Sequence, residues 1–365
     1  MKPLKLGFIG GGVNSAVGRA HYAACRMDGL FEVVTGCFSR DKHANEETGR
    51  TFDCCATSLG GVAVYADLDA VVVLTPTPHH ADDVELALNF DIPVICEKAL
   101  AATPEQTAQL CVQRERTNGF LTVTYNYTGY PMIRELREII QADGLGRIIS
   151  VHAEMPQEGY LRTEAHPQDW RLKDGIIPGV HLDLGTHLHH LIHFLTNDVP
   201  IRLVAQQSCH GNFGVIDDVN CLAEYASGFT AALWFGKASL GHRNGLRVRV
   251  CGTAGSAEWV QSSPEEMMLS YANGGRATLD RASPGLHIAN DSRYQRFKAG
   301  HPAGFIEAYA SLYSDIAVWL RGHLGENVGE TTVPAALYSP EIAHQGLVMM
   351  AAMVDSANRK EWVPV

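Results

Sequence analysis

The sequence predicts an α/β protein in which a doubly wound parallel sheet precedes an α+β region with a large, mostly antiparallel, open sheet. Strand-like and helical segments alternate up to about residue 125, a pattern typical of βαβ units. Longer strand-like segments separated by turn residues follow, and a helical pattern returns at Phe305. We therefore expect two domains, residues 1–125 and 126–365.

Five strands build the predicted N-terminal sheet. The third is nearly all apolar, as in a parallel sheet that helices cover on both faces. The predicted strands are 4–10, 31–38, 68–76, 92–98 and 120–126, and the predicted helices are 15–27, 79–90 and 103–119. The last helix has Pro104 near its first turn and a glycine after its end, which are ordinary helix-boundary signals.

The second region has the pattern of an antiparallel sheet with helices on one face. A predicted helix at 131–143 leads into a strand at 146–155. The further predicted strands are 201–209, 219–226, 229–236, 246–252 and 256–261. Turn sequences such as "ASGFTA" separate these strands, which favours hairpins over helical crossovers.

The composition argues against several classes of protein. Apolar residues make up 46% of the chain, enough for a large core, and the net charge of −11 argues against sequence-independent binding to nucleic acid. No apolar run reaches the roughly 18 residues of a membrane helix, and the N-terminus lacks a signal-peptide pattern. Nine scattered cysteines without a CxxC pair fit reduced thiols. We expect a cytoplasmic protein without nucleic-acid or membrane partners.

A glycine-rich turn between the first strand and the first helix predicts a dinucleotide site. In "FIGGGVNSAVGRAH", Gly10 and Gly12 fit the usual GxGxxG spacing, Ser15 takes the third place and Gly18 follows three positions later. Because glycines have no side chain, a pyrophosphate can approach the backbone there, and the helix N-terminus attracts its negative charge. A turn used only for packing is the alternative. The expected cofactor residues of this turn are Gly10, Gly12, Val13, Asn14 and Ser15.

The end of the second strand, "CFSRD", bears on the choice between NAD and NADP. Ser39 lies where the acid that binds the ribose diol of NAD is expected, and Arg40 follows it. Serine and arginine suit a 2′-phosphate, so the sequence slightly favours NADP. Two alternatives stay open: Asp41 serves the diol if the loop shifts, or Arg40 is only a solvated loop residue.

Other candidate residues follow the later strands, at the edge where ligands of open α/β sheets bind. Pro76 ends the third strand where a nicotinamide or its ribose would lie. Lys98 follows Glu97 directly after a buried strand and is placed to hold a substrate hydroxyl; a simple surface lysine is the alternative. Tyr125 and Asn126 come at the end of the last strand.

The segment "HLDLGTHLHHLIHFL" (181–195) holds five histidines. Asp183 and His187 lie four positions apart and share a helix face. His187 is the candidate base, because imidazole exchanges a proton near neutral pH. Asp183 either orients it or binds a second hydroxyl, unless it only caps the helix. His189 and His193 form another pair, but no third ligand is evident, so we expect no metal and assign packing or surface roles to the other histidines.

Six short motifs occur in order along the chain. They are "GFIGGG" (7–12), Thr75, Pro76 and His80 in TPxxxH, "CEKAL" (96–100), "LGRIISV" (145–151), "DLGTH" (183–187) and "CGTAGSAEW" (251–259). Together they resemble the Gfo/Idh/MocA oxidoreductase family, which includes inositol and sugar dehydrogenases, over most of the chain. The sequence departs from the family at Ala99, where its EKP motif has proline, and at Thr77, where asparagine is usual.

The resemblance implies a Rossmann domain that binds NAD or NADP, and an α/β domain whose open sheet often forms oligomer contacts. Lys98 matches the EKP lysine, and Asp183 and His187 match the D-x-G-x-H segment. The family's chemistry is hydride transfer between a sugar or polyol carbon and nicotinamide C4, with the histidine or lysine handling the proton. The further cofactor residues that we expect are Ser39, Arg40, Thr75, Pro76, His80, Glu97 and Lys98.

We therefore expect an NAD(P)-dependent oxidoreductase, a dimer or tetramer, that acts on a CH–OH group of a sugar, polyol or sugar derivative. Aromatic and planar cationic side chains suit such substrates, although packing or surface roles are equally open. The expected substrate contacts are Tyr125, Asn126, Trp170, Arg171 and His301. One alternative is glycoside cleavage or elimination through a transient oxidation by tightly bound NAD. Another is a non-catalytic dinucleotide sensor, against which Lys98, Asp183 and His187 together argue.

Overall fold

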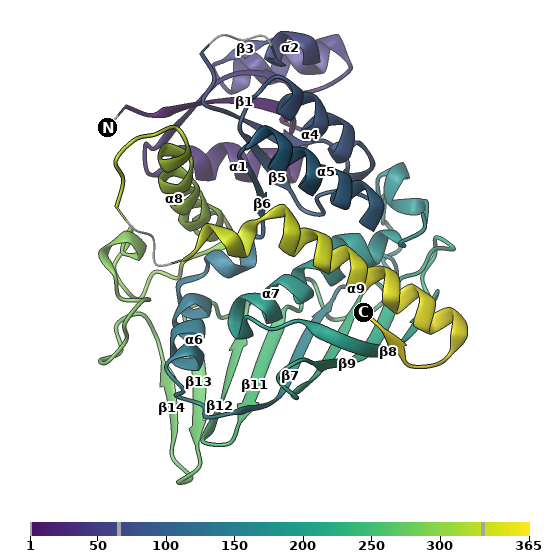
Figure 1. Ribbon diagram of the computed structural model, residues 1–365, viewed down its shortest axis with the longest axis vertical. Coiled ribbons are helices and arrows are strands. Elements are labelled where there is room, and N and C mark those ends of the chain that lie inside the picture. The colour runs from purple at the N-terminus through teal and green to yellow at the C-terminus, as the bar shows by residue number, and fades with distance from the viewer. Residues whose placement is uncertain (1, 64–66, 330–332) are drawn as a thin grey trace. The chain divides into compact units, whose positions relative to one another are not determined.

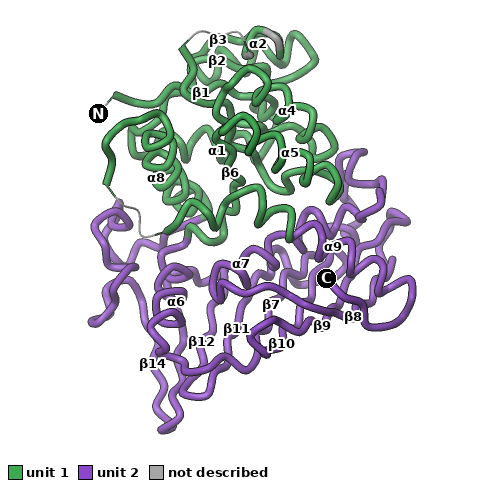
Figure 2. Tube along the Cα trace, viewed as in Figure 1, with its two compact units in different colours: residues 1–129, 305–345 green, residues 130–304, 346–365 purple. Residues whose placement is uncertain are grey.

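The computed structural model describes residues 2–63, 67–329 and 333–365. The chain divides into two compact units (Figure 2): unit 1 holds residues 1–129 and 305–345, and unit 2 holds residues 130–304 and 346–365. Each unit is built on its own sheet. The sequence predicts a single division near residue 125, whereas in the structure the chain returns to unit 1 at Phe305 because the helix that begins there packs on the first helix.

Unit 1 contains a six-stranded parallel sheet in the order β3-β2-β1-β4-β5-β6. The strands are β1 (Leu4–Gly10), β2 (Phe31–Cys37), β3 (Cys55–Ala56), β4 (Ala70–Leu74), β5 (Val94–Glu97) and β6 (Leu121–Thr124). Val71, Val72 and Val73 of β4 are all fully buried, as expected for a strand covered on both faces. The strand order reverses between β1 and β4, which is where such sheets open to ligands.

The helices of unit 1 are α1 (Ala16–Met27), α2 (Lys42–Thr51), α3 (Leu59–Ala63), α4 (His80–Asn89), α5 (Pro104–Thr117) and α8 (Phe305–His323). Helix α8 lies beside α1 (Figure 1) and packs on it. Gly129 fits against the carbonyl of Ala308 so closely that a Cβ there would collide with it. Helix α8 is therefore part of the core of unit 1.

Unit 2 contains a nine-stranded sheet in the order β14-β13-β12-β11-β7-β10-β9-β8-β15, antiparallel except for the β7–β10 pair. The strands are β7 (Ile148–Pro156), β8 (Pro200–Ser208), β9 (Asp218–Tyr225), β10 (Thr230–Gly236), β11 (Arg247–Gly252), β12 (Gly255–Val260), β13 (Met267–Tyr271), β14 (Arg276–Leu279) and β15 (Val363–Pro364). This sheet and the parallel sheet of unit 1 confirm the predicted fold class.

Helices cover one face of the large sheet (Figure 1): α6 (Pro131–Gln141), α7 (Thr186–Thr196) and most of α9 (Pro340–Arg359). The burial of β10 follows the alternation of a strand covered on one face only. Ala231, Leu233 and Phe235 are buried, while Ala232 and Trp234 on the other face are half-exposed. In the described part of the chain, no helix is long and apolar enough to cross a membrane.

Candidate functional site

The parallel strands of unit 1 bring the candidate residues of this unit to one edge of the sheet. Because all six strands run in the same direction, their carboxyl ends meet at that edge. The residues placed there are Gly10, Gly12, Val13, Asn14 and Ser15 after β1, Ser39 and Arg40 after β2, Thr75, Pro76 and His80 after β4, Glu97 and Lys98 at β5, and Tyr125 and Asn126 after β6.

The glycine-rich turn after β1 forms a cradle without side chains. Gly10 and Gly11 have φ angles of +81° and +73°, which favour glycine. A Cβ on Gly18 would collide with the carbonyl of Gly11, so the turn lies directly against α1. Ser15 caps α1, and its Oγ accepts a hydrogen bond of 3.1 Å from the backbone N–H of Gly18. The open N-terminus of α1 and the close backbone fit a dinucleotide pyrophosphate.

The residues after β2 are held by local hydrogen bonds. Asp41 is the N-cap of α2, and its Oδ1 accepts a hydrogen bond of 2.8 Å from the N–H of Ala44. The Ser39 Oγ accepts one of 3.1 Å from the N–H of Asp41. Arg40 Nη2 lies 3.4 Å from Nε2 of His79, which follows β4. The carboxylate of Asp41 is therefore occupied with its own helix, while Arg40 reaches toward the neighbouring loop.

His80 ties the loop after β4 to the turn after β5. Its Nε2 lies 2.6 Å from the carbonyl of Thr75, and its Nδ1 lies 2.7 Å from the carbonyl of Ala99. The side chain is buried, and this burial lowers the pKa of His80, although both carbonyls oppose the shift. The hydroxyl of Thr75 donates to Asp83 at 2.6 Å. Both residues thus hold the loops around Lys98, whose peptide bond to Ala99 is cis.

Glu97 belongs to a buried polar network that sequence reasoning missed. Tyr309 donates a hydrogen bond of 2.7 Å to Glu97 Oε1, which lies 3.6 Å from Nε2 of His21. His21 Nδ1 lies 2.7 Å from the hydroxyl of Tyr313. Burial raises the pKa of Tyr309 well above its ordinary value, so the phenol stays a donor. In the described chain, Glu97 Oε2 is buried without a hydrogen-bond partner, so a cofactor hydroxyl at this edge would fit it.

Tyr125 and Asn126, expected at the substrate, are both buried. Burial raises the pKa of the Tyr125 phenol, and the nearby Glu97 adds to the shift. The Nδ2 of Asn126 is buried and has no hydrogen-bond partner among the residues that the structure describes. Both residues follow β6, and their contact with a substrate stays a prediction.

In unit 2, Asp183 lies in a cluster of charged and aromatic side chains. Its Oδ2 accepts hydrogen bonds from Arg171 Nη1 at 2.6 Å and from Lys237 Nζ at 2.5 Å. The guanidinium of Arg171 stacks on Trp170 at 4.3 Å, and the ammonium of Lys237 lies over the ring of Tyr160 at 5.2 Å. The structure therefore joins three of the predicted residues, and it adds Lys237, which follows β10.

The alternative that Asp183 caps the histidine helix is wrong. A π-helical turn, His181–Gly185, precedes α7, so the helix begins before Asp183 and the N-cap position of α7 is Gly185. A carboxylate within the helical turn is not placed to receive the first free N–H groups. It instead turns to the two cations.

All five histidines of the segment are buried, so the surface alternative is wrong and packing holds for most of them. Burial lowers the pKa of both His181 and His189 to about 3. Among the residues that the structure describes, neither ring nitrogen of His181 or His189 has a hydrogen-bond partner. His189 stacks on His193 at 6.3 Å. Across residues 2–63, 67–329 and 333–365, no three His, Cys, Asp or Glu side chains lie close enough to hold a metal ion, and independence from metal stays a prediction.

His301, the last predicted substrate contact, lies in a loop that buried Arg281 anchors. The guanidinium of Arg281 donates to the carbonyls of Tyr294 and His301, at 2.5 and 2.8 Å, and pairs with Glu265 at 2.5 Å. The imidazole of His301 itself is exposed. The backbone at His301 is therefore fixed, and a role of its side chain stays a prediction.

Comparison with known proteins places both halves of the chain in one family. Residues 4–125 match the oxidoreductase family with an NAD-binding Rossmann fold, and residues 133–258 match the GFO/IDH/MocA C-terminal domain. The uncharacterized oxidoreductase YfiI of Bacillus subtilis is 27% identical, with 87% of this chain and 85% of that protein covered. Inositol 2-dehydrogenase of Rhizobium meliloti is 24% identical, with 84% and 88% covered.

Solved structures agree with these matches. An inositol dehydrogenase homolog from Azotobacter vinelandii, in complex with NADH and myo-inositol, superposes with a TM-score of 0.88 at 26% identity. The match covers 100% of this chain and 98% of the other. The similarity thus extends over both units and supports the fold and the cofactor class together.

Proposed function

Because the chain belongs to the Gfo/Idh/MocA family of NAD-binding oxidoreductases, we propose that it transfers hydride between nicotinamide and a hydroxyl-bearing carbon of a sugar, polyol or sugar derivative. The observation that carries this proposal is the set of residues at the carboxyl edge of the unit 1 sheet. There the glycine cradle suits a dinucleotide, and so does the buried Glu97 Oε2, which has no hydrogen-bond partner among the described residues; Lys98 is the next residue. The relatives named for inositol support the substrate class.

The nicotinamide, when bound, supplies the hydride acceptor or donor. We assign the hydroxyl proton of the substrate to His187, which would receive it during oxidation. The ammonium of Lys98 would stabilise the developing negative charge on the substrate oxygen. Asp183 would bind a neighbouring hydroxyl rather than take the proton, because a carboxylate that two cations hold is a weak base. Trp170 and Arg171 would present an aromatic and a planar cationic face to the sugar.

We propose that NADP is preferred over NAD. The support is local: Arg40 and Ser39 follow β2, and the next residue, Asp41, caps α2 instead of facing a ribose diol. Arginine is the side chain best suited to a phosphate. Dissociation constants for both cofactors, measured on the purified protein, test this preference.

A substrate panel tests the activity itself. Inositols, aldoses and other polyols are offered with NAD and with NADP, and reduction is followed at the absorbance of the reduced nicotinamide. We expect net reduction with at least one of these compounds. Turnover of a glycoside without net reduction, by protein that keeps its cofactor through purification, would instead indicate a transient oxidation.

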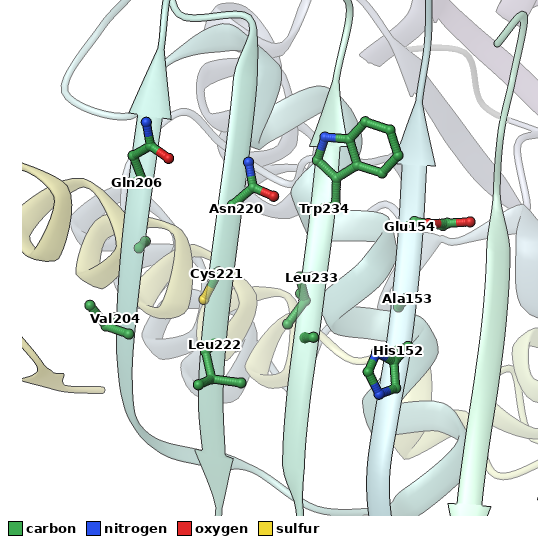
Figure 3. Close-up of a pocket in the computed structure, with 12 residues that line it drawn as sticks. His152, Ala153, Glu154, Val204, Gln206, Asn220, Cys221, Leu222, Leu233 and Trp234 are labelled. Carbon is green, nitrogen blue, oxygen red and sulfur yellow. The ribbon is translucent and has the colours of Figure 1, made fainter. Parts of the chain in front are cut away.

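We also propose a homo-oligomer that forms through the open face of the unit 2 sheet. Figure 3 shows this face, where β7, β8, β9 and β10 line an open hollow of about 430 Å³. Leu222 is 41% exposed there, and the half-exposed Val204 and Trp234 lie on neighbouring strands. Apolar side chains on an uncovered sheet are typical of a protein interface.

A cytoplasmic location is proposed as well. All nine cysteines are free, and several are buried as small apolar groups. Unpaired thiols in this number suit a reducing compartment. Fractionation of the source cells, with the dehydrogenase activity measured in each fraction, tests the location.

A further inference from the structure

The loops after β2 and β4 contact each other through one pair of side chains. These two strands are the neighbours of β1 in the sheet, so their loops lie on either side of the turn that follows β1. Arg40 extends from one loop and His79 from the other, and their nearest nitrogens, Nη2 and Nε2, are 3.4 Å apart. Both side chains are exposed. The pair therefore lies open to solvent at the point where the adenosine half of a dinucleotide is expected.

We propose that His79 is a specificity-determining residue that binds the 2′-phosphate of NADP together with Arg40. This inference rests on the proposed preference for NADP and adds a residue that the sequence did not indicate. Ser39 would supply a third donor through its hydroxyl proton, since its oxygen already accepts from the backbone of Asp41. Two loops would thus present three donor groups to one phosphate.

The surroundings of the pair favour an anion. Among the described residues, no carboxylate lies within ion-pair distance of Arg40 or His79, whereas exposed Arg202 pairs with Glu224. The nearby acids are engaged elsewhere: Asp41 caps α2, and Asp83 accepts from Thr75 at 2.6 Å. Two adjacent nitrogen groups without an acid are a poor surface contact on their own, and a phosphate with three acceptor oxygens would satisfy both.

The side chain of His79 does not stabilise the helix that it precedes. It occupies the N-cap of α4, but its side chain makes no capping hydrogen bond, and the first turn of that helix already holds Asp82 and Asp83. The neighbouring His80, in contrast, is buried between two carbonyls. Of the two histidines in this loop, one holds the loop together and the other is available to a ligand.

Binding of cofactor fragments tests the proposal without any turnover. Adenosine 2′,5′-bisphosphate and adenosine 5′-monophosphate differ only by the 2′-phosphate, and calorimetry gives their dissociation constants for the full-length protein. We expect the wild type to bind the bisphosphate more tightly. His79→Ala should weaken bisphosphate binding about ten-fold, the scale of one hydrogen bond to a charged group, and leave the monophosphate within about two-fold. Arg40→Ala should weaken it at least as much.

His43→Ala is the matched control, because His43 is an exposed histidine in the first turn of the adjacent α2. It should change neither constant. A wild type that does not distinguish the two fragments contradicts the proposed NADP preference itself. If the wild type prefers the bisphosphate and only Arg40→Ala removes that preference, NADP use stands and the role of His79 is wrong. Equal weakening of both fragments by His79→Ala would assign the residue to the adenosine and also overturn the proposal.

Discussion

Asp183 shows how one carboxylate oxygen stabilises two cations that are partly out of water. Its side chain is 20% exposed, that of Arg171 is 27% exposed and that of Lys237 only 10%. Asp183 and Arg171 were predicted as site residues, but Lys237 lies 54 positions from Asp183 in the chain. A lone lysine after a strand has no pattern that distinguishes it from a surface residue, so only the fold indicates its role.

We expect Asp183→Asn to destabilise the protein more than removal of the lysine does. A neutral amide leaves two cations facing each other, and the free energy of unfolding should fall by about 1.5–3 kcal/mol. Adding Lys237→Met should restore part of that loss, because the least exposed cation is then gone. Urea denaturation of both single variants and the double variant measures this coupling. Strictly additive losses would mean that the two side chains do not interact.

His187 has the clearest expected effect on turnover. We expect His187→Ala to lower turnover by about 10²–10⁴, the range for a single general base, with cofactor affinity nearly unchanged. The acid limb of the pH profile for oxidation should disappear in the variant. His193→Ala, on the same buried helix, is the control and should affect stability more than chemistry. Normal turnover by His187→Ala would place the base elsewhere, most simply at Lys98.

At the scale of elements, apolar periodicity decides most of what could be predicted, although β13 has alternating buried residues and was missed. β1, β4 and α1 all follow from their apolar patterns. In contrast, α2, "KHANEETGRT", buries only Thr48 and Gly49, so it has almost no apolar face, and its main signal is the cap at Asp41. Helix α7 is buried from Thr186 to Leu195, and a helix that is buried all round has no polar face to indicate its orientation.

Two of the histidines with a lowered pKa, His181 and His189, predict how stability depends on pH. His181 and His189 have a pKa of about 3 when folded, against about 6.5 when unfolded, so the unfolded state binds more protons in acid. Well above pH 6.5 both histidines are neutral in the folded and in the unfolded state, so they add no pH dependence there. Stability should therefore fall as pH decreases from 6.5, by about 1.4 kcal/mol per histidine per pH unit.

His189→Leu isolates this effect. Between pH 6.5 and about 5, most carboxylates stay ionised in both states, so the slope reports histidines. In the variant, the slope of the unfolding free energy against pH should be smaller by about 1.4 kcal/mol per pH unit, as measured by urea denaturation at several pH values. His43→Ala, at an exposed site, should leave it unchanged. An unaltered slope in His189→Leu would show that His189 is protonated in the folded protein.

At the scale of the whole molecule, contacts between segments far apart in the sequence form the parts of the site that could not be predicted. Tyr309 donates to Glu97 across 212 positions, and His21 lies beside both. The motif that contains Glu97 and Lys98 could be predicted, whereas the two tyrosines of α8 that complete its surroundings could not. They are ordinary aromatic residues of a C-terminal helix until the chain returns to unit 1.

The open face of the large sheet yields the last prediction. Leu222 lies on β9 between Ala232 of β10 and Val204 of β8, where a charge would be taken out of water on association. We expect the wild type to sediment as a dimer or larger oligomer and Leu222→Glu to shift toward the monomer. Val112→Glu, at a 66% exposed apolar position on α5 of unit 1, is the matched control and should keep the wild-type mass. Sedimentation velocity over a range of protein concentrations distinguishes these outcomes. A monomeric wild type, or an unchanged mass for Leu222→Glu, would rule out this face as the main interface.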